Sequence, residues 1–233
     1  MTSHLTFDQE FTGSTLDVFR PIPAWKPGFG RDSDFMGDLR QVSVAKGMCT
    51  ITAQRMATPS GRPFASGIFT TDGTFAQAYG TWVARIRYPK GNGVWPAFWL
   101  LRAGDPPAVA SNNPIEIDIM EAYPHTRKIG WAGPDYVEST LLYTEGSSAR
   151  HQVGRHTGID LTSGFHTFRL HWTKRKLTFS VGSTVIGEIT ENVPTEPMFM
   201  LLNLAIGQTD DRADDSTPDT AAMDIAWVRV YAP

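Results

Sequence analysis

Residues 113–123 read Asn-Pro-Ile-Glu-Ile-Asp-Ile-Met-Glu-Ala-Tyr, which places three acids in an otherwise apolar run of strand-forming residues. Successive side chains of a strand point to opposite faces, so Glu116 and Asp118 share one face and the isoleucines take the other. Strict alternation would send Glu121 to the isoleucine face. A β-bulge at residues 119–120 inserts one extra residue and returns Glu121 to the face of the other two acids. The segment therefore predicts a bulged strand with three carboxylates on one side.

Three carboxylates on one strand face repel one another, so at least one of their pKa values must rise. Glycoside hydrolysis uses such an asymmetric pair: one ionised carboxylate attacks the anomeric carbon, and one protonated carboxyl group donates to the leaving oxygen. Salt-bridged acids on an exposed strand are an alternative that the neighbouring apolar residues disfavour. A calcium cluster is a second alternative, disfavoured because Ca²⁺ also needs carbonyl oxygens and a loop that wraps it. The residues alone do not order the roles of the two glutamates.

The composition points to an uncharged partner. The formal net charge of the 233 residues is -3, only 19% of them are charged, and no block of like charge occurs. These values give no sign of a nucleic-acid groove or a membrane surface, so we expect neither partner. Aromatic residues make up 11% of the chain, which suits either sugar binding or a large β core.

Short Gly and Pro punctuation, roughly every ten residues, is typical of an all-β sandwich or barrel. Because no interior stretch resembles a linker, we expect one domain over residues 1–233. Three alternating runs between residues 165 and 189 predict a β-meander, and the acidic stretch 209–220 predicts a surface loop before the last strand. The strand-like segments are 48–54, 79–88, 97–101, 115–123, 165–172 and 223–231.

Several other chemistries lack their motifs. Cys49 is the only cysteine, which excludes an internal disulfide and a cysteine-based zinc site, and its apolar neighbours predict a buried small hydrophobe. The six histidines form no zinc pattern, and neither a serine-hydrolase elbow nor a phosphate-binding loop occurs. No secretory leader opens the sequence, yet we expect an extracellular monomer whose export route the sequence leaves open.

The run Glu-Ile-Asp-Ile-Met-Glu at residues 116–121 resembles the active-site motif of glycoside hydrolase family 16, in the bulged form of its laminarinase-like branch. Residues 79–101 are similar to the family's preceding strands, residues 202–207 to a later strand and residues 223–231 to the closing strand. The resemblance implies an all-β, concanavalin-like jelly-roll sandwich. Its two curved antiparallel sheets would carry an open glycan-binding cleft.

The resemblance also implies roles for the three acids: Glu116 as nucleophile, Asp118 as its assisting acid and Glu121 as general acid/base. The expected function is a retaining endo-β-glycanase that needs no catalytic cofactor and cleaves a polysaccharide, β-1,3- or mixed-linkage β-1,3-1,4-glucan first. A β-galactan hydrolase and a glycan transglycosylase stay open as alternatives. A non-catalytic carbohydrate-binding module is an alternative of another class, which the presence of all three acids disfavours.

Aromatic and amide side chains near the acids are candidate substrate contacts. Trp95 and Trp99 precede the acidic strand, and their flat faces suit sugar rings, although tryptophans are also common in sandwich cores. Trp131, in the loop that follows the acidic strand, is a further candidate. The amide of Asn203 suits sugar hydroxyls, with a hydrogen-bonded core asparagine as the alternative.

Members of the family often carry a structural calcium ion, and by resemblance Glu10, Gly47 and Asp224 stand at its ligand positions. Ordinary surface polarity is the alternative for these three residues.

The sequence departs from the laminarinase-like pattern at three positions. Ile68 stands where a basic residue is usual, and Glu138 and Leu142 stand where two histidines are usual. We therefore expect different contacts at the sugar subsites beside the cleavage point. A standard β-1,3-glucan specificity is left open.

Overall fold

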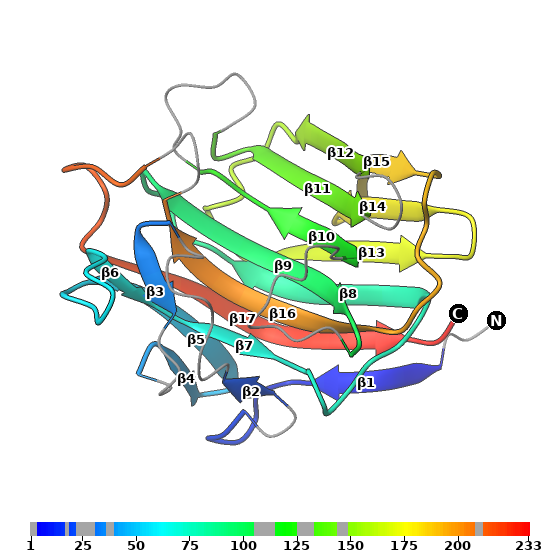
Figure 1. Cartoon of the computed structure of the whole chain (residues 1–233), viewed down its shortest axis with the longest axis horizontal. Coiled ribbons are helices and arrows are strands. Elements are labelled where there is room, and N and C mark those ends of the chain that lie inside the picture. The colour runs from blue at the N-terminus through cyan, green and yellow to red at the C-terminus, as the bar shows by residue number, and fades with distance from the viewer. Residues whose placement is uncertain are drawn as a thin grey trace.

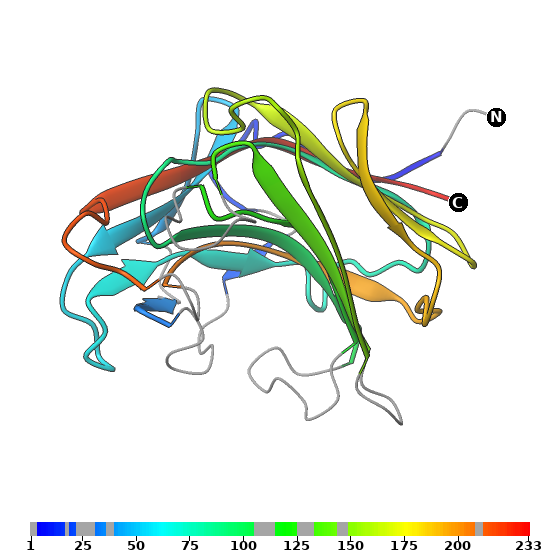
Figure 2. The ribbon, with the colours of Figure 1, turned by 90° about the horizontal axis from the view of Figure 1, so that it is seen from above.

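The computed structural model describes residues 4–16, 19–21, 31–35, 40–104, 115–124, 133–143, 149–207 and 212–233. Within these ranges the regular secondary structure is seventeen β-strands and no helix. The strands form two curved sheets stacked face to face (Figures 1 and 2). The described residues therefore contain no helix that could span a membrane.

The first sheet has ten strands, antiparallel except for one parallel pair, β3 with β6. Its continuous order is β15 (Thr184–Ile189), β14 (Leu177–Val181), β13 (His166–Trp172), β8 (Gly80–Arg87), β17 (Thr220–Tyr231), β5 (Met48–Arg55), β6 (Phe64–Ser66) and β3 (Ser33–Phe35). Two further strands complete it: β1 (Leu5–Gln9) pairs with β17, and β4 (Val42–Ala45) pairs with β5.

The second sheet has seven antiparallel strands and carries the acidic segment. Its order is β12 (Ala149–His156), β11 (Tyr136–Tyr143), β10 (Ile115–Glu121), β9 (Val94–Arg102), β16 (Met198–Ile206), β7 (Ile68–Thr70) and β2 (Arg20–Pro21). The acidic strand β10 lies between β11 and β9, so both of its neighbours can support its side chains.

The hydrophobic core lies between the two sheets and is built by alternation along each strand. On β16, Met198, Met200 and Leu202 point into this core, while the residues between them point to the outer face of the second sheet. Among the described residues, Trp82 and Trp172 are the largest fully buried side chains, and full burial of a large apolar side chain contributes roughly 2–3 kcal/mol. Cys49 is also fully buried in the core, as its apolar neighbours indicated.

The central strands of the second sheet are buried on their outer face as well. A second apolar cluster lies there, made of Ile68, Ala97, Trp99, Leu101, Phe199 and Leu201. These residues alternate with core residues along β7, β9 and β16. The outer face of the second sheet is thus an apolar floor beside the acids of β10.

The architecture confirms the expected all-β, two-sheet jelly roll, and each predicted strand segment contains a strand. The predicted meander is β13, β14 and β15, which pair in sequence order. Residues 212–219 form no strand, as expected of the loop before β17, whereas residues 209–211 lie outside the described part of the chain. The single domain over residues 1–233 stays a prediction.

Candidate active site

The register of β10 against its neighbours shows the bulge that the sequence predicted. Asp118 lies opposite Trp99 on β9, but Glu121, three positions later, lies opposite Ala97, only two positions away. The pairing with β11 shifts at the same place. Ile119 and Met120 both pack into the core between the sheets, so the extra residue is accommodated on the apolar side. Glu121 consequently returns to the face of Asp118.

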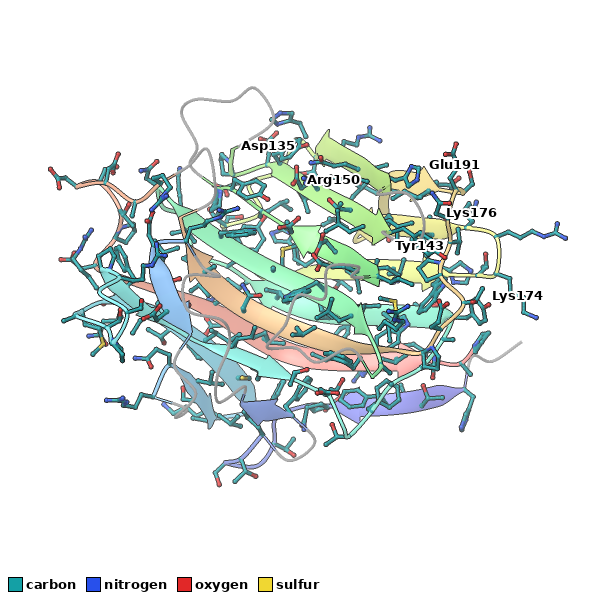
Figure 3. All side chains as sticks on the ribbon, viewed as in Figure 1. Asp135, Tyr143, Arg150, Lys174, Lys176 and Glu191 are labelled. Atoms are coloured by element: carbon teal, nitrogen blue, oxygen red, sulfur yellow. The ribbon has the colours of Figure 1, made fainter. Side chains whose placement is uncertain are left out.

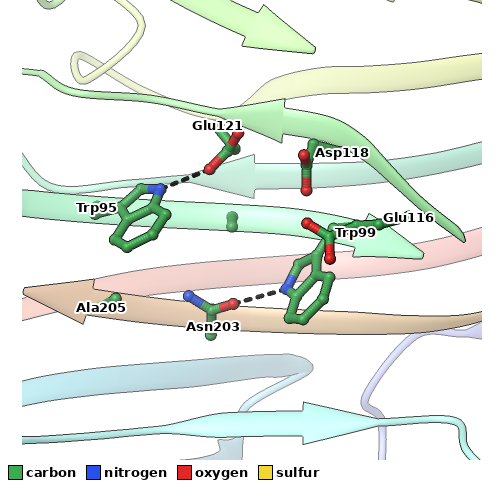
Figure 4. A pocket seen from close by; sticks show the side chains of 8 residues that line it. Trp95, Trp99, Glu116, Asp118, Glu121, Asn203 and Ala205 are labelled. Carbon is green, nitrogen blue, oxygen red and sulfur yellow. Dashed lines mark hydrogen bonds between the residues drawn. The ribbon is translucent and has the colours of Figure 1, made fainter. Parts of the chain in front are cut away.

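A pocket on this face brings together all three acids and most of the predicted binding residues (Figure 4). The carboxyl groups come from β10, and the remaining lining comes from β9 and β16. Trp131 lies outside the described residues. The pocket is lined by Trp95, Ala97, Trp99, Glu116, Asp118, Glu121, Asn203 and Ala205.

The three carboxyl groups are shielded from solvent and lie close enough to affect one another. Asp118 and Glu121 are 5% and 7% exposed, and Glu116 is half-buried. Burial, followed by the charge of Glu121, raises the pKa of Glu116 to about 8 and that of Asp118 well above its usual range. Burial also raises the pKa of Glu121, to about 7. The trio therefore retains at least one proton at neutral pH.

Asp118 and Glu116 are joined by a hydrogen bond that favours the ionised form of Glu116. A hydrogen bond between two acids requires one shared proton, because an ionised carboxylate can only accept. Burial raises the pKa of both acids, so Glu116 is ionised at neutral pH only while the shared proton resides on Asp118. The role of Asp118 as the assistant of Glu116 stays a prediction.

Glu121 has two polar contacts that hold its carboxyl group. The indole Nε1 of Trp95 donates to Oε1 of Glu121 at 2.8 Å, and the hydroxyl of Tyr123 lies 3.3 Å from the same oxygen (Figure 4 shows the first bond). Trp95 is half-buried and its ring lies 6.3 Å from that of Tyr123. Its predicted place in the pocket is confirmed, whereas its stacking on sugar stays a prediction. The hydrogen bond to Glu121 was not anticipated from the sequence.

Trp99 and Asn203 form a second pair in the pocket. Each is 3% exposed, and Nε1 of Trp99 donates to Oδ1 of Asn203 at 2.7 Å. This bond leaves the amide nitrogen of Asn203 pointing away from Trp99 (Figure 4). Both residues line the pocket, and both also belong to the packed outer face of the sheet.

The three departures from the laminarinase-like pattern occupy different environments. Ile68 is 1% exposed and packs in the same apolar cluster as Trp99. Leu142 is half-buried and lies opposite Glu116 on the neighbouring strand. Glu138 is 1% exposed and lies opposite Glu121. The sequence flagged Glu138 only as a departure, yet it is a fourth buried acid beside the predicted trio.

The two carboxylates predicted for calcium already have cationic partners. Glu10 is exposed and bonds Arg229, while Asp224 accepts two hydrogen bonds from Arg87, at 3.1 and 2.6 Å. Gly47 lies in the turn between β4 and β5 with φ 71°. Among the described residues no group of three or more His, Cys, Asp or Glu side chains could hold a metal ion. To bind a calcium ion, Glu10 and Asp224 would have to leave their arginine partners, and the calcium site itself stays a prediction.

A pair of glutamates and an aspartate in one pocket with tryptophans, on the outer face of a two-sheet jelly roll, defines the glycoside hydrolase class. The family profile described as glycosyl hydrolases family 16 matches residues 29–229. The chain belongs to that family.

Relatives and solved structures agree with this assignment. The chain is 33% identical over 202 residues to endo-1,3-1,4-beta-glycanase ExsH of Rhizobium meliloti (strain 1021), a match covering 82% of this chain and 39% of the relative. It is 31% identical to EglC of the same organism, again with 82% and 39% coverage, so it spans about two fifths of these relatives. The catalytic domain of an endo-1,3-beta-glucanase (laminarinase) from Thermotoga petrophila RKU-1 superimposes with a TM-score of 0.83. That match has 25% identity and covers 99% and 98% of the two chains.

The raised pKa values predict that the acidic cluster destabilises the fold as pH rises. A carboxyl group with a raised pKa binds its proton more tightly in the folded state. Stability is therefore lost between the unfolded value, about 4.5, and the folded value, about 8 for Glu116. Glu116→Gln removes this titrating group. It should raise the Tm at pH 8 by about 3–6 °C for each unit by which folding raises the pKa of Glu116, with little gain at pH 4.5. Differential scanning calorimetry at both pH values measures this, and a lower Tm for Glu116→Gln at pH 8 contradicts it.

The arginine partners of Glu10 and Asp224 predict that calcium does not stabilise the protein. A site filled at 100 times its Kd would contribute about 2.7 kcal/mol. For a chain of this size that corresponds to a rise in Tm of about 5–10 °C. We expect the same Tm in excess CaCl₂ and in EDTA. If the Tm is several degrees higher in CaCl₂ than in EDTA, this expectation is wrong, and the ligand set that the family resemblance implied is supported.

Proposed function

We propose that the chain is an endo-acting, retaining β-glucan hydrolase that takes β-1,3- or mixed-linkage β-1,3-1,4-glucan. The observation that carries the proposal is the pair of glutamates, one buried and one half-buried, which the bulge of β10 brings into one aromatic-lined pocket. The names of the Rhizobium meliloti relatives and of the Thermotoga petrophila laminarinase support a glucan substrate. An extracellular monomer remains the expectation.

The proposed reaction is a double displacement. Ionised Glu116, hydrogen-bonded to protonated Asp118, attacks the anomeric carbon and forms a covalent glycosyl-enzyme. Protonated Glu121 gives its proton to the leaving oxygen as that bond breaks. Glu121, now ionised, takes a proton from water, and the resulting hydroxide equivalent displaces Glu116 from the sugar. Two inversions give net retention, and the mechanism requires the two carboxyl groups to be about 5–5.5 Å apart.

The surrounding residues suit this division of roles. Trp95 and Tyr123 fix the carboxyl group of Glu121, because both contact its Oε1. A general acid must be held in place to protonate the leaving oxygen efficiently. The amide of Asn203 accepts from Trp99 and lines the same pocket, which supports a bond from its amide nitrogen to a sugar hydroxyl.

Other functions of the same fold remain alternatives. A β-galactan hydrolase would use the same trio with different subsite contacts, and a transglycosylase would resolve the same intermediate with a sugar instead of water. A non-catalytic carbohydrate-binding module is disfavoured because it has no use for three buried acids with raised pKa values. Activity on a panel of polysaccharides separates these outcomes.

Glu116→Ala should abolish release of reducing sugar from barley mixed-linkage glucan and laminarin while the fold persists. The side chain faces the pocket, so its removal deletes the nucleophile without emptying the core. Azide should restore turnover of an activated aryl β-glucoside and yield the inverted glycosyl azide. Glu191→Ala is the matched control, because Glu191 is exposed at the edge of the molecule (Figure 3).

The polysaccharide panel should also contain β-galactans and a sugar acceptor for transfer. Activity on galactan alone would replace the glucan assignment, and oligosaccharide elongation would favour a transglycosylase. Full activity of a folded Glu116→Ala would refute the assignment of the nucleophile.

A further inference from the structure

Glu138 is a buried acid that the proposed reaction leaves without a role. It lies on β11, directly opposite Glu121 on β10, and is 1% exposed. The hydroxyl of Tyr123 lies 3.3 Å from Oε1 of Glu121 and 3.2 Å from Oε1 of Glu138. The two carboxyl oxygens are therefore at most about 6.5 Å apart. One phenol bridges two acids.

This bridge constrains where a proton resides. A phenol has one proton to donate and can also accept. If both glutamates were ionised, Tyr123 could serve only one of them, and one contact would be a repulsion between oxygens. Both contacts become hydrogen bonds when one glutamate is protonated and donates to the phenol, which in turn donates to the other. The geometry thus fits one proton shared between Glu121 and Glu138.

The donors around Glu138 favour its ionised form. Nε2 of Gln152 donates to Oε2 of Glu138 at 2.5 Å, and the hydroxyl of Tyr136 forms a further hydrogen bond to this carboxyl group. Gly154, opposite Glu138 on β12, makes room for that hydroxyl: a Cβ atom on Gly154 would lie 2.1 Å from it. With Tyr123, three neutral donors reach Glu138, and hydrogen bonds to a carboxylate stabilise its charge.

The charges that face Glu121 favour its protonated form. Glu116 and Asp118 line the same pocket, and Glu138 lies on the other side. After burial, the charge of Glu138 is the largest influence that raises the pKa of Glu121. Arg150, exposed on β12 (Figure 3), acts on all four acids in the opposite sense.

We propose that Glu138 is a positioning residue whose charge, relayed through Tyr123, keeps the proton on Glu121. The inference deepens the proposed function, because Glu121 must hold this proton to act on the leaving group. The same charge serves the second displacement. Once Glu121 has given up its proton, repulsion from Glu138 makes it a stronger base toward the attacking water.

Glu138→Gln tests this by removing the charge while keeping the shape of the side chain. Without the charge of Glu138, the ionised form of Glu121 is no longer repelled, so the pKa of Glu121 should fall by about 1–2 units. The alkaline limb of kcat/KM should move to lower pH by the same amount. At pH 7 kcat should fall about 5- to 50-fold with little change in KM.

The titration of Glu121 can be followed without any substrate. In protein labelled with ¹³C at the glutamate carboxyl carbons, the resonance of Glu121 is assigned by its loss in Glu121→Gln. Its titration is compared between wild type, Glu138→Gln and the exposed control Glu191→Gln, which should leave it unchanged. If no glycan is cleaved, the proposed function fails, but this titration still decides the role of Glu138.

An unchanged titration of Glu121 in folded Glu138→Gln overturns the proposal, and a rise would show that Glu138 holds the proton instead. If Glu138→Gln does not fold, as judged by near-ultraviolet circular dichroism, Gln152→Ala replaces it. Losing the donor Gln152 raises the pKa of Glu138 and weakens its charge, so the pKa of Glu121 should fall by a smaller amount. No fall in Gln152→Ala is equally contrary to the proposal.

Discussion

The site depends on one backbone irregularity, the bulge of β10 between Asp118 and Glu121. Regular pairing would turn Glu121 toward the core between the sheets, where an unpaired charge costs several kcal/mol. The extra residue instead lets Ile119 and Met120 both pack into the core and returns Glu121 to the pocket. The same bulge places Glu121 beside Trp95 and opposite Glu138. The hydrogen bond from Trp95 and the proximity of Glu138 both follow from it.

Like-charge repulsion between the acids is the second constraint, and the fold reduces this repulsion without separating the acids. Four acids lie on neighbouring strands with little exposure to water, and the pKa values of all four are raised. One shared-proton contact, Asp118 with Glu116, relieves part of the repulsion, and the proton that we propose is shared through Tyr123 between Glu121 and Glu138 relieves more. In the proposed reaction the first pair leaves Glu116 ionised and the second keeps the proton on Glu121, which is the asymmetry that double displacement requires.

The sequence predicts the bulge because three acids in an apolar strand have only one arrangement that keeps them all off the core. It predicts Trp95 as a pocket residue but not its bond to Glu121, since cross-strand register and side-chain rotamers are not encoded in local periodicity. The sequence marks Glu138 only as an acid at a position where histidine is usual, and only its pairing with β10 reveals its neighbour. The calcium positions came from resemblance, which could not show that Arg229 and Arg87 bind these carboxylates.

If the two glutamates act by double displacement, the first product must keep the anomeric configuration of the substrate. Proton NMR spectra recorded in the first minutes of glucan hydrolysis, before mutarotation, resolve the anomeric protons of the new reducing ends. The geometry predicts that the β-anomer appears first and the α-anomer grows in later. Initial appearance of the α-anomer would mean that water attacks directly, and would contradict the role of Glu116 as nucleophile.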